Sequence, residues 1–251
     1  LFPRAPVRHT VFEKYPGVAV DDYLDAFWPQ ASSQWDGLRH IVDDEQGCLY
    51  NGVGLADVLE PGAGPLGIEH WARRGIVGRG VLVDVVEQLA HEGVALAPFE
   101  FFPIEPDLIE RTLGRAGIEL ARGDILVFRT GWVEAYERLS AQERVDYAET
   151  IRPGSPGLYG SDIPPFLWDN RVAAVAADNP ALEAAHPQKG SDLALHRALI
   201  ARLGMPLGEL WDVAALAADC RADGVYDFLL TSAPLRLTGG VGSPPNVLAL
   251  K

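Results

Sequence analysis

Basic residues and cysteines are scarce in this sequence, and each shortage excludes a class of protein. The chain has 21 Lys and Arg against 35 Asp and Glu, which gives a formal net charge of −14. Because nucleic-acid binding needs a basic surface, this balance argues against a nucleic-acid partner. The two cysteines, Cys48 and Cys220, do not have the C-x-x-C spacing of a zinc ribbon. We interpret them as two buried thiols of a cytoplasmic protein.

Long apolar runs are missing too, since no stretch approaches the length that a transmembrane helix needs. We therefore expect no membrane partner. The sequence has no recognisable signal peptide, and it opens on Leu1 rather than Met. This start predicts either a processed chain or a fragment from which an upstream segment is missing.

The chain does contain enough apolar material for one globular domain. Its 251 residues are 48% hydrophobic and 22% charged, as is typical of soluble folded proteins. We find no internal repeat, and we predict a single domain over residues 1–251. Residues 1–27 are Pro-rich with little periodicity, so we expect them to wrap the surface of that domain.

Apolar, β-branched segments alternate with segments of helical spacing along the rest of the chain. The predicted strands cover residues 80–86, 125–128, 172–176, 227–230 and 246–250. The predicted helices cover residues 107–113, 132–139, 163–170 and 192–203. Residues 52–67 and 238–245 are rich in Gly and Pro and predict loops. This alternation indicates a mixed α/β domain.

Residues 30–40, with the sequence Q-A-S-S-Q-W-D-G-L-R-H, concentrate side chains that carry chemistry. Asp36 and His40 are good ligands for zinc or manganese, and on a helix their spacing would place them on one face. Taken alone the pair is a weak signal, because an Asp that caps a helix and a His that bonds a loop give the same pattern. From these two residues alone we favour the structural interpretation.

The same segment resembles the H-x-G-T-H-x-D-x-P-x-H signature of the cyclase family that includes kynurenine formamidase and isatin hydrolase. Gln30 and Gln34 fall on its first two histidines, whereas Asp36 and His40 match outright. More narrowly, Q-W-D-G-x-x-H is similar to a fungal and actinobacterial branch of the family. Further landmarks follow in the family's order, so that the resemblance covers roughly residues 28–250. These landmarks are residues 129–132, 156–158, 175–178, 232–235 and 239–244.

The resemblance implies a metal site with one position kept and one altered. The kept ligands, which would bind one divalent ion, zinc or manganese, are Asp36, His40, His196 and Glu209. The other position has lost its imidazoles to Gln30 and Gln34, whose neutral amide oxygens are poor ligands for zinc. We expect these two amides to hydrogen-bond the substrate or the attacking water instead. Kynurenine formamidase activity itself is not expected, because that enzyme is expected to use the intact set of histidines.

The family also implies a fold and an assembly. The expected fold is a swivelling β/β/α domain, in which a mixed sheet curls toward a barrel with helices outside. Family members assemble as dimers or tetramers, and a neighbouring subunit often lends residues to the pocket. We therefore expect a homodimer or homotetramer that acts on a small-molecule substrate.

The implied reaction is hydrolysis of an amide, a formamide or a cyclic amide by metal-activated water. The residues expected to carry catalysis are Asp36, His40, Gln34 and Gln30. The expected substrate contacts are the same two glutamines with Trp35 and Arg39. A core position explains Trp35 equally well, and a surface position is the safer interpretation of Arg39.

The same residues are compatible with other functions. The protein could be a lactonase, dehydratase or cyclase of a secondary metabolite, with or without a metal. Without a metal, the histidines and carboxylates would act as general acid and base. A third possibility is a relative that binds a small molecule without catalysis, because two lost histidines are what a decaying active site would show.

Overall fold

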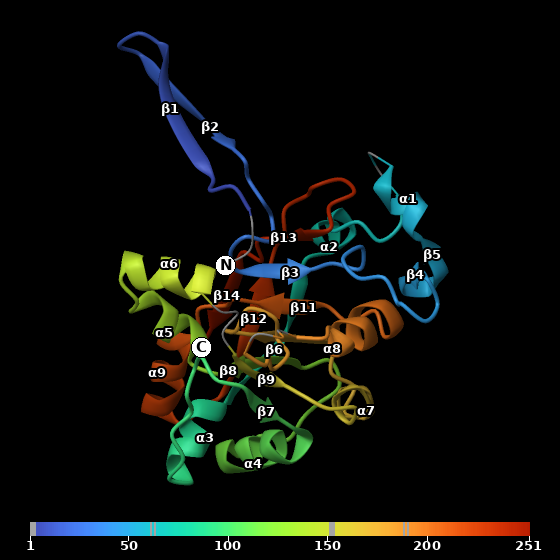
Figure 1. Ribbon diagram of the computed structural model, residues 1–251, viewed down its shortest axis with the longest axis vertical. Helices are drawn as coiled ribbons and strands as arrows, with labels where there is room; N and C mark the ends of the chain where they lie inside the picture. Colours follow the sequence, from blue (N-terminus) through green and yellow to red (C-terminus); the bar gives the residue numbers. More distant parts are fainter. Residues whose placement is uncertain (1–3, 61, 63, 151–153, 188, 190) are drawn as a thin grey trace.

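A single mixed sheet organises the protein, whose computed structural model describes residues 4–60, 62, 64–150, 154–187, 189 and 191–251. The sheet has eight strands and is strongly curled into a half-barrel (Figure 1). In spatial order the strands are β13 (Gly242–Ser243), β3 (Gln34–Asp36), β11 (Leu207–Glu209), β10 (Ala174–Ala177), β8 (Ile125–Arg129), β6 (Ile76–Asp84), β12 (Asp227–Ser232) and β14 (Val247–Leu250). The expected mixed α/β fold with a curled sheet is confirmed.

The middle of the sheet is parallel and its flanks are antiparallel. Strands β6, β8, β10 and β11 run parallel, while β3 pairs antiparallel with β11 and β12 pairs antiparallel with β6. The carboxyl ends of the four parallel strands therefore meet at one edge of the sheet. Polar residues end or follow these strands, namely Asp84, Arg129, Asp178 and Glu209. In open α/β sheets this edge is where sites form.

Both faces of the parallel strands are buried, so their sequences are continuous apolar runs. Val81, Leu126 and Val175 pack into one core, and their neighbours Leu82, Val127 and Ala176 pack into the other. The first core also contains apolar residues of α3 (Val85–His91), α4 (Pro106–Ala116), α7 (Ile163–Asp169) and the segment 195–200. The second core contains residues of α9 (Ala214–Asp223).

The remaining elements are short. The helices are α1 (Leu55–Leu59), α2 (Glu69–Arg74), α5 (Trp132–Glu137), α6 (Ala141–Thr150), α8 (Ala194–His196), η1 (Tyr50–Gly52) and the π-helix η2 (Arg197–Arg202). Two small sheets pair β4 (Cys48–Leu49) with β5 (Val53–Gly54) and β7 (Phe102–Ile104) with β9 (Pro156–Leu158). Cys220 is a buried free thiol, and Cys48 is free and half-buried. Within the described residues, no helix has the length and apolar character to cross a membrane.

Several boundaries differ from those predicted. The strand predicted over residues 80–86 begins at Ile76 and ends at Asp84, because the Asp84 carboxylate accepts a hydrogen bond from the Glu87 N–H and starts α3. The helix predicted over residues 192–203 is one α-helical turn followed by η2. The segment 52–67, predicted to be a loop, contains α1.

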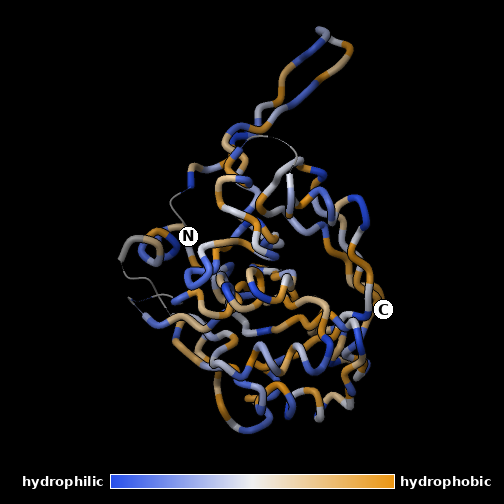
Figure 2. Tube along the Cα trace, turned by 90° about the vertical axis from the view of Figure 1, so that its right-hand side faces the viewer, coloured by the Kyte–Doolittle hydropathy of each residue, from blue (hydrophilic) through white to orange (hydrophobic). Residues whose placement is uncertain are grey.

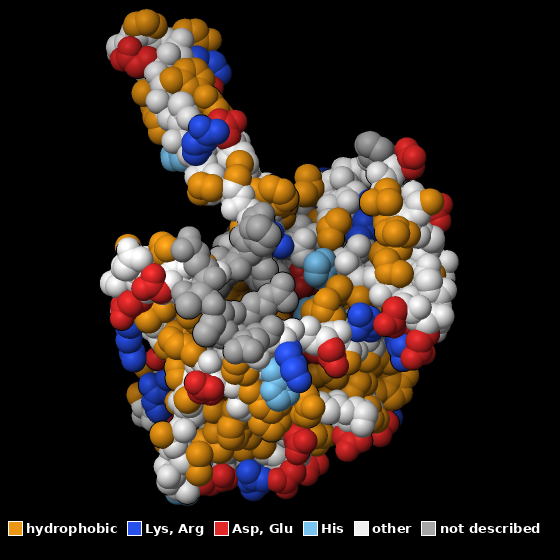
Figure 3. All heavy atoms as spheres, in the orientation of Figure 1, with side chains coloured by type: hydrophobic (Ala, Val, Ile, Leu, Met, Phe, Trp, Pro, Cys, Tyr) orange, Lys and Arg blue, Asp and Glu red, His pale blue; other side chains and the backbone are white. Residues whose placement is uncertain are grey.

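The N-terminal segment is the main correction to the predicted fold. Strands β1 (Arg8–Tyr15) and β2 (Ala19–Asp25) form an antiparallel hairpin that projects away from the body instead of wrapping it (Figures 1 and 2). Almost all of its residues are exposed, and apolar side chains are visible along it in Figure 3. Because neither face is buried, the sequence does not show the alternation that identifies a half-buried strand.

Candidate metal centre

Strand pairing brings together residues that are far apart in the sequence. Strand β3 runs antiparallel to β11, and its register sets Gln34 opposite Glu209 and Asp36 opposite Leu207. Side chains alternate between the two faces of a strand, so Gln34 and Asp36 share a face while Trp35 points to the other. The pairing thus brings Gln34 and Asp36 of the motif next to Glu209, which lies in the second half of the chain.

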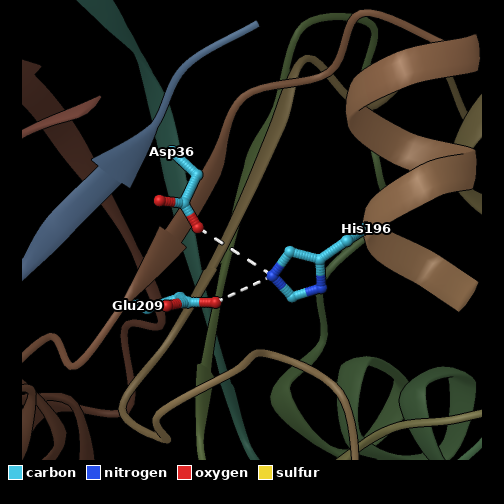
Figure 4. A group of neighbouring side chains, drawn as sticks. All are labelled: Asp36, His196 and Glu209. Carbon is cyan, nitrogen blue, oxygen red and sulfur yellow. Dashed lines mark hydrogen bonds and ion pairs between the residues drawn. The ribbon is translucent and has the colours of Figure 1, made fainter. Parts of the chain in front are cut away.

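Three of the predicted ligands converge on a common point. His196 Nε2 lies 3.0 Å from Glu209 Oε1 and 3.9 Å from Asp36 Oδ2 (Figure 4). One potential ligand atom from each of the three side chains lies within 4.8 Å of the others. All three residues are buried, and they come from β3, β11 and the last residue of α8.

Glu183 also belongs to this group, although it is not among the residues predicted from the sequence. Its Oε1 accepts a hydrogen bond from the backbone N–H of His196 at 2.8 Å and lies 2.5 Å from His196 Nδ1. The Ser191 hydroxyl donates to the second oxygen of Glu183 at 2.9 Å. A carboxylate on Nδ1 sets the tautomer and leaves the lone pair of Nε2 for a metal. No sequence spacing identifies Glu183, because it reaches His196 from the irregular segment after β10.

His40, the fourth expected ligand, lies at the border of the group. Its Nε2 is 3.9 Å from Asp36 Oδ2, and its side chain keeps 29% of its surface exposed. Among the described residues, the set of mutually close ligand atoms contains Asp36, His196 and Glu209 but not His40. Its Nδ1 lies 3.2 Å from Gln30 Nε2, an N–H donor, so the neutral ring carries its proton on Nε2.

The two glutamines bond to the carboxylates. Gln34 Nε2 donates to Glu209 Oε2 at 2.7 Å and to Asp36 Oδ1 at 3.3 Å. Gln30 Nε2 donates to the same oxygen of Asp36. These contacts differ from the expected contacts with substrate or water, because the amide hydrogens are already used within the protein.

Unpaired polar atoms indicate room for a further group. Asp36 Oδ2 and Gln34 Oε1 are buried and accept no hydrogen bond from the part of the chain that the structure describes. A buried carboxylate oxygen without a partner is costly unless something occupies it. Two carboxylates and an imidazole nitrogen are a donor set that suits zinc or manganese, so these residues fit a divalent cation.

The pKa values of these side chains also favour a bound cation. Burial and the repulsion of Asp36 raise the pKa of Glu209 to about 8. Burial opposes protonation of His196, yet its hydrogen bonds to Glu183 and Glu209 outweigh this and raise its pKa to about 10. Burial also lowers the pKa of His40, which Asp36 offsets in part. The buried carboxylates thus attract positive charge, which a proton or a metal cation can supply.

Two predicted substrate contacts are corrected by their positions. Trp35 is fully buried in the second core, where its Nε1 donates to Ser232 Oγ and its ring packs nearly perpendicular to that of Trp211, with the ring centroids 4.8 Å apart. Arg39 is also buried, and it donates to the backbone oxygens of Pro65 and Gly239. Trp35 faces away from the carboxylates because of the strand alternation, and Arg39 ties two loops together.

A cavity of about 460 Å³ lies at the base of the N-terminal hairpin, where residues on both sides of β1 and β2 line it. Trp28, Phe27 and Tyr136 line it, together with Leu210, which directly follows Glu209. Leu210 has a φ of 55°, a left-handed conformation that is unusual for leucine and is found where surrounding contacts enforce it. The cavity therefore combines aromatic side chains with a residue that directly follows a candidate ligand in the sequence.

The fold and the site together define a mixed α/β protein with a buried carboxylate–imidazole centre that could hold a divalent metal ion. The chain belongs to the cyclase family: the family model described as "Putative cyclase" matches residues 7–184. His196 and Glu209 lie beyond that match, but similarity to solved structures extends over them. The crystal structure of a novel cyclase is 36% identical, with a TM-score of 0.83 over 99% of this chain and 83% of that chain.

More distant structures share the fold. Isatin hydrolase A from Labrenzia aggregata, bound to benzyl benzoate, is 16% identical, with a TM-score of 0.65 over 99% of this chain and 84% of that one. A predicted metal-dependent hydrolase from Bacillus stearothermophilus is 16% identical, with a TM-score of 0.54 over 97% of this chain and 86% of that one. None of the curated proteins matches the chain.

Proposed function

We propose that this protein is a metal-dependent hydrolase that opens an amide, a formamide or a cyclic amide. The observation that carries the proposal is the buried convergence of Asp36 Oδ2, His196 Nε2 and Glu209 Oε1. Membership of the cyclase family supports it, as does the fold shared with an isatin hydrolase and a predicted metal-dependent hydrolase.

Asp36, His196 and Glu209 would hold one divalent ion, zinc or manganese. When bound at such a site, an ion of this kind lowers the pKa of water and polarises a substrate carbonyl. Three protein ligands leave a coordination position open, as hydrolysis requires. Glu183 would keep His196 in the ligating tautomer through its contact with Nδ1.

His40 would transfer the proton. Its lowered pKa keeps the ring neutral at pH 7, and its Nε2–H lies on the border of the group. In hydrolysis the neutral ring would take a proton from the attacking water and become imidazolium, and this cation would give a proton to the leaving nitrogen as the C–N bond breaks. Gln30, next to Nδ1, orients the ring for this step.

The cavity that Leu210 lines would bind the remainder of the substrate. Its volume of about 460 Å³ suits a small molecule, and the exposed rings of Phe27 and Trp28 offer faces on which a planar group can stack. The proposed substrate is therefore a small amide with an aromatic or other planar apolar part.

The test is cation content and turnover in wild type and two histidine variants. Protein reconstituted with zinc or manganese should hydrolyse at least one member of a panel of aryl formamides, anilides and cyclic amides. His196→Ala should lose both the bound ion and turnover. His40→Ala should keep the ion, measured by plasma mass spectrometry, but lose turnover. His91→Ala, on the exposed side of α3, is the matched control and should change neither.

Other outcomes of this test separate the alternatives. The panel also includes lactones, and turnover of lactones but of no amide would make the protein a lactonase. Thermal stabilisation by panel compounds without any turnover would indicate a binding protein. If wild type takes up no divalent ion, the metal-dependent proposal is excluded. Catalysis by the same residues as general acid and base would then be the leading hypothesis.

A further inference from the structure

The carboxylates of Asp36 and Glu209 each have two oxygens in different surroundings. Asp36 Oδ2 and Glu209 Oε1 face His196 Nε2, at 3.9 and 3.0 Å. Asp36 Oδ1 and Glu209 Oε2 face Gln34 Nε2 instead, at 3.3 and 2.7 Å. One side of the carboxylate pair therefore meets an imidazole nitrogen, and the other side meets amide hydrogens.

The orientation of the Gln34 amide is fixed by charge. If the amide turned over, its Oε1 would lie against two carboxylate oxygens, which repel it. Gln34 is only 3% exposed, so water cannot relieve that repulsion. Gln30 reinforces the arrangement, because its Nε2 donates to the same Asp36 oxygen.

The amide also changes which ligands the site can accept. Two buried carboxylates side by side repel each other and need donors or cations between them. The Gln34 NH₂ group supplies two hydrogen-bond donors without a formal charge. Its nitrogen has no lone pair to offer a metal, so a cation on that side would meet hydrogens rather than a ligand.

We propose that Gln34, assisted by Gln30, stands in for a second cation and confines the centre to a single divalent ion on the His196 side. Gln34 is then a positioning residue that holds Asp36 and Glu209 with one oxygen each turned toward the ion. This inference rests on the proposed metal site, but it does not depend on which bond the protein hydrolyses.

Replacement of Gln34 by glutamate tests the inference. Gln34→Glu keeps the shape, removes the donors and adds a third buried carboxylate. We expect calorimetric titration with Mn²⁺ or Zn²⁺ to give one ion per chain in wild type and two in Gln34→Glu. Without cations the variant should melt at a lower temperature than wild type, and added cation should reverse the loss. Gln34→Met, of similar shape but with no donor and no charge, should still bind one ion.

Gln142→Glu, on the exposed surface of α6, adds the same charge elsewhere and should bind one ion. If Gln34→Glu does not fold, Gln30→Glu replaces a donor to the same Asp36 oxygen at a less buried position and should also bind two ions. Two ions in wild type, or one in each folded glutamate variant, would overturn the inference.

The experiment also separates this inference from the proposed function. If wild type binds no divalent ion, both fail together. If it binds one ion and Gln34→Glu binds two, but no amide is hydrolysed, the inference holds and the proposed reaction fails.

Discussion

At the scale of single residues, the centre depends on a side chain that is not itself a candidate metal ligand. Glu183 holds His196 through both Nδ1 and the backbone N–H. Burial opposes ionisation of Glu183, yet its hydrogen bond with His196 outweighs this and lowers the pKa of the carboxyl. His196 therefore faces Asp36 and Glu209 with its orientation already set.

Glu183→Gln should weaken cation binding while leaving all candidate ligands in place. The amide can still accept one hydrogen bond, but it does not make Nε2 of His196 more basic. Loss of such a partner typically lowers metal affinity by about 10–100-fold. Calorimetric titration with Zn²⁺ measures the change, and Glu110→Gln on the exposed side of α4 is the control. An unchanged dissociation constant would show that Glu183 has no part in the centre.

Asp178 makes stability depend on pH outside the metal centre. Its carboxylate accepts hydrogen bonds from Thr130 and from the Gly131 N–H, but burial dominates and raises its pKa to about 6 from an ordinary value of 3.8. The native state therefore binds more protons than the unfolded state between these two values. The stability from the protonated form is complete below the lower value and is lost as the pH rises through about 6.

Asp178→Asn should remove this dependence. A difference of roughly two pKa units corresponds to about 3 kcal/mol, of which about 2 kcal/mol falls between about pH 4.5 and pH 7.5. The free energy of unfolding of wild type, measured with urea and relative to the variant, should therefore fall by about 2 kcal/mol over that range. A constant difference between the two proteins would contradict the raised pKa. Asp162→Asn, at an exposed position, should show no such change.

At the scale of elements, strand β11 needs the glycine at position 208, which directly precedes Glu209 of the metal centre. A Cβ on Gly208 would lie 2.7 Å from the Ala176 Cβ and 2.9 Å from the Trp211 ring. Both neighbours belong to the second core and have little room to move. The close approach of β11 to β10 at this point sets the position of Glu209.

Gly208→Ala should therefore destabilise the protein by about 1–3 kcal/mol, the usual cost of overpacking a core. Gly114→Ala is the matched control in the exposed part of α4, where nothing lies within 4 Å of the new methyl group. That change should stabilise by about 0.5–1 kcal/mol, because alanine loses less backbone freedom in a helix. Urea unfolding measures both, and equal effects would refute the steric argument.

At the scale of the whole molecule, the projecting hairpin needs a partner. A two-stranded hairpin alone is marginally stable in water. This one nevertheless exposes apolar side chains, among them Val11 at 59%, Val18 at 84% and Val20 at 69%. We propose that a second copy of the chain covers it, in a homodimer or a larger homo-oligomer. In such an assembly each copy covers the same surface of the other.

Light scattering after size-exclusion chromatography tests this assembly. Wild type should have at least twice the mass of one chain. The double change Val18→Lys and Val20→Lys should shift the protein toward the monomer, because buried charges oppose the contact. Leu59→Lys changes a residue of α1 that is 72% exposed, and it should leave the mass unchanged. A wild-type monomer at micromolar concentration would refute the proposed assembly.

The sequence by itself determined the class of fold, the core strands and most of the candidate ligands. Strands such as Ile125–Arg129 were predictable because both faces are buried, which requires a continuous apolar run. Asp36, His196 and Glu209 were identified because their chemistry and their order along the chain resemble the cyclase family. The chemical type of a ligand is a property of the residue itself, so it can be recognised from the sequence without knowledge of the contacts.

Only the tertiary structure decided which side chains meet and in which orientation. The antiparallel register of β3 and β11 directs Gln34 toward Glu209 and Trp35 into the core, and no local pattern specifies a register between strands so far apart. Glu183 joined the centre for the same reason. The hairpin was missed because exposure on both faces removes the periodicity that predicts a strand. Pairing across long stretches of chain depends on the packing of the whole sheet, which sequence spacing does not record.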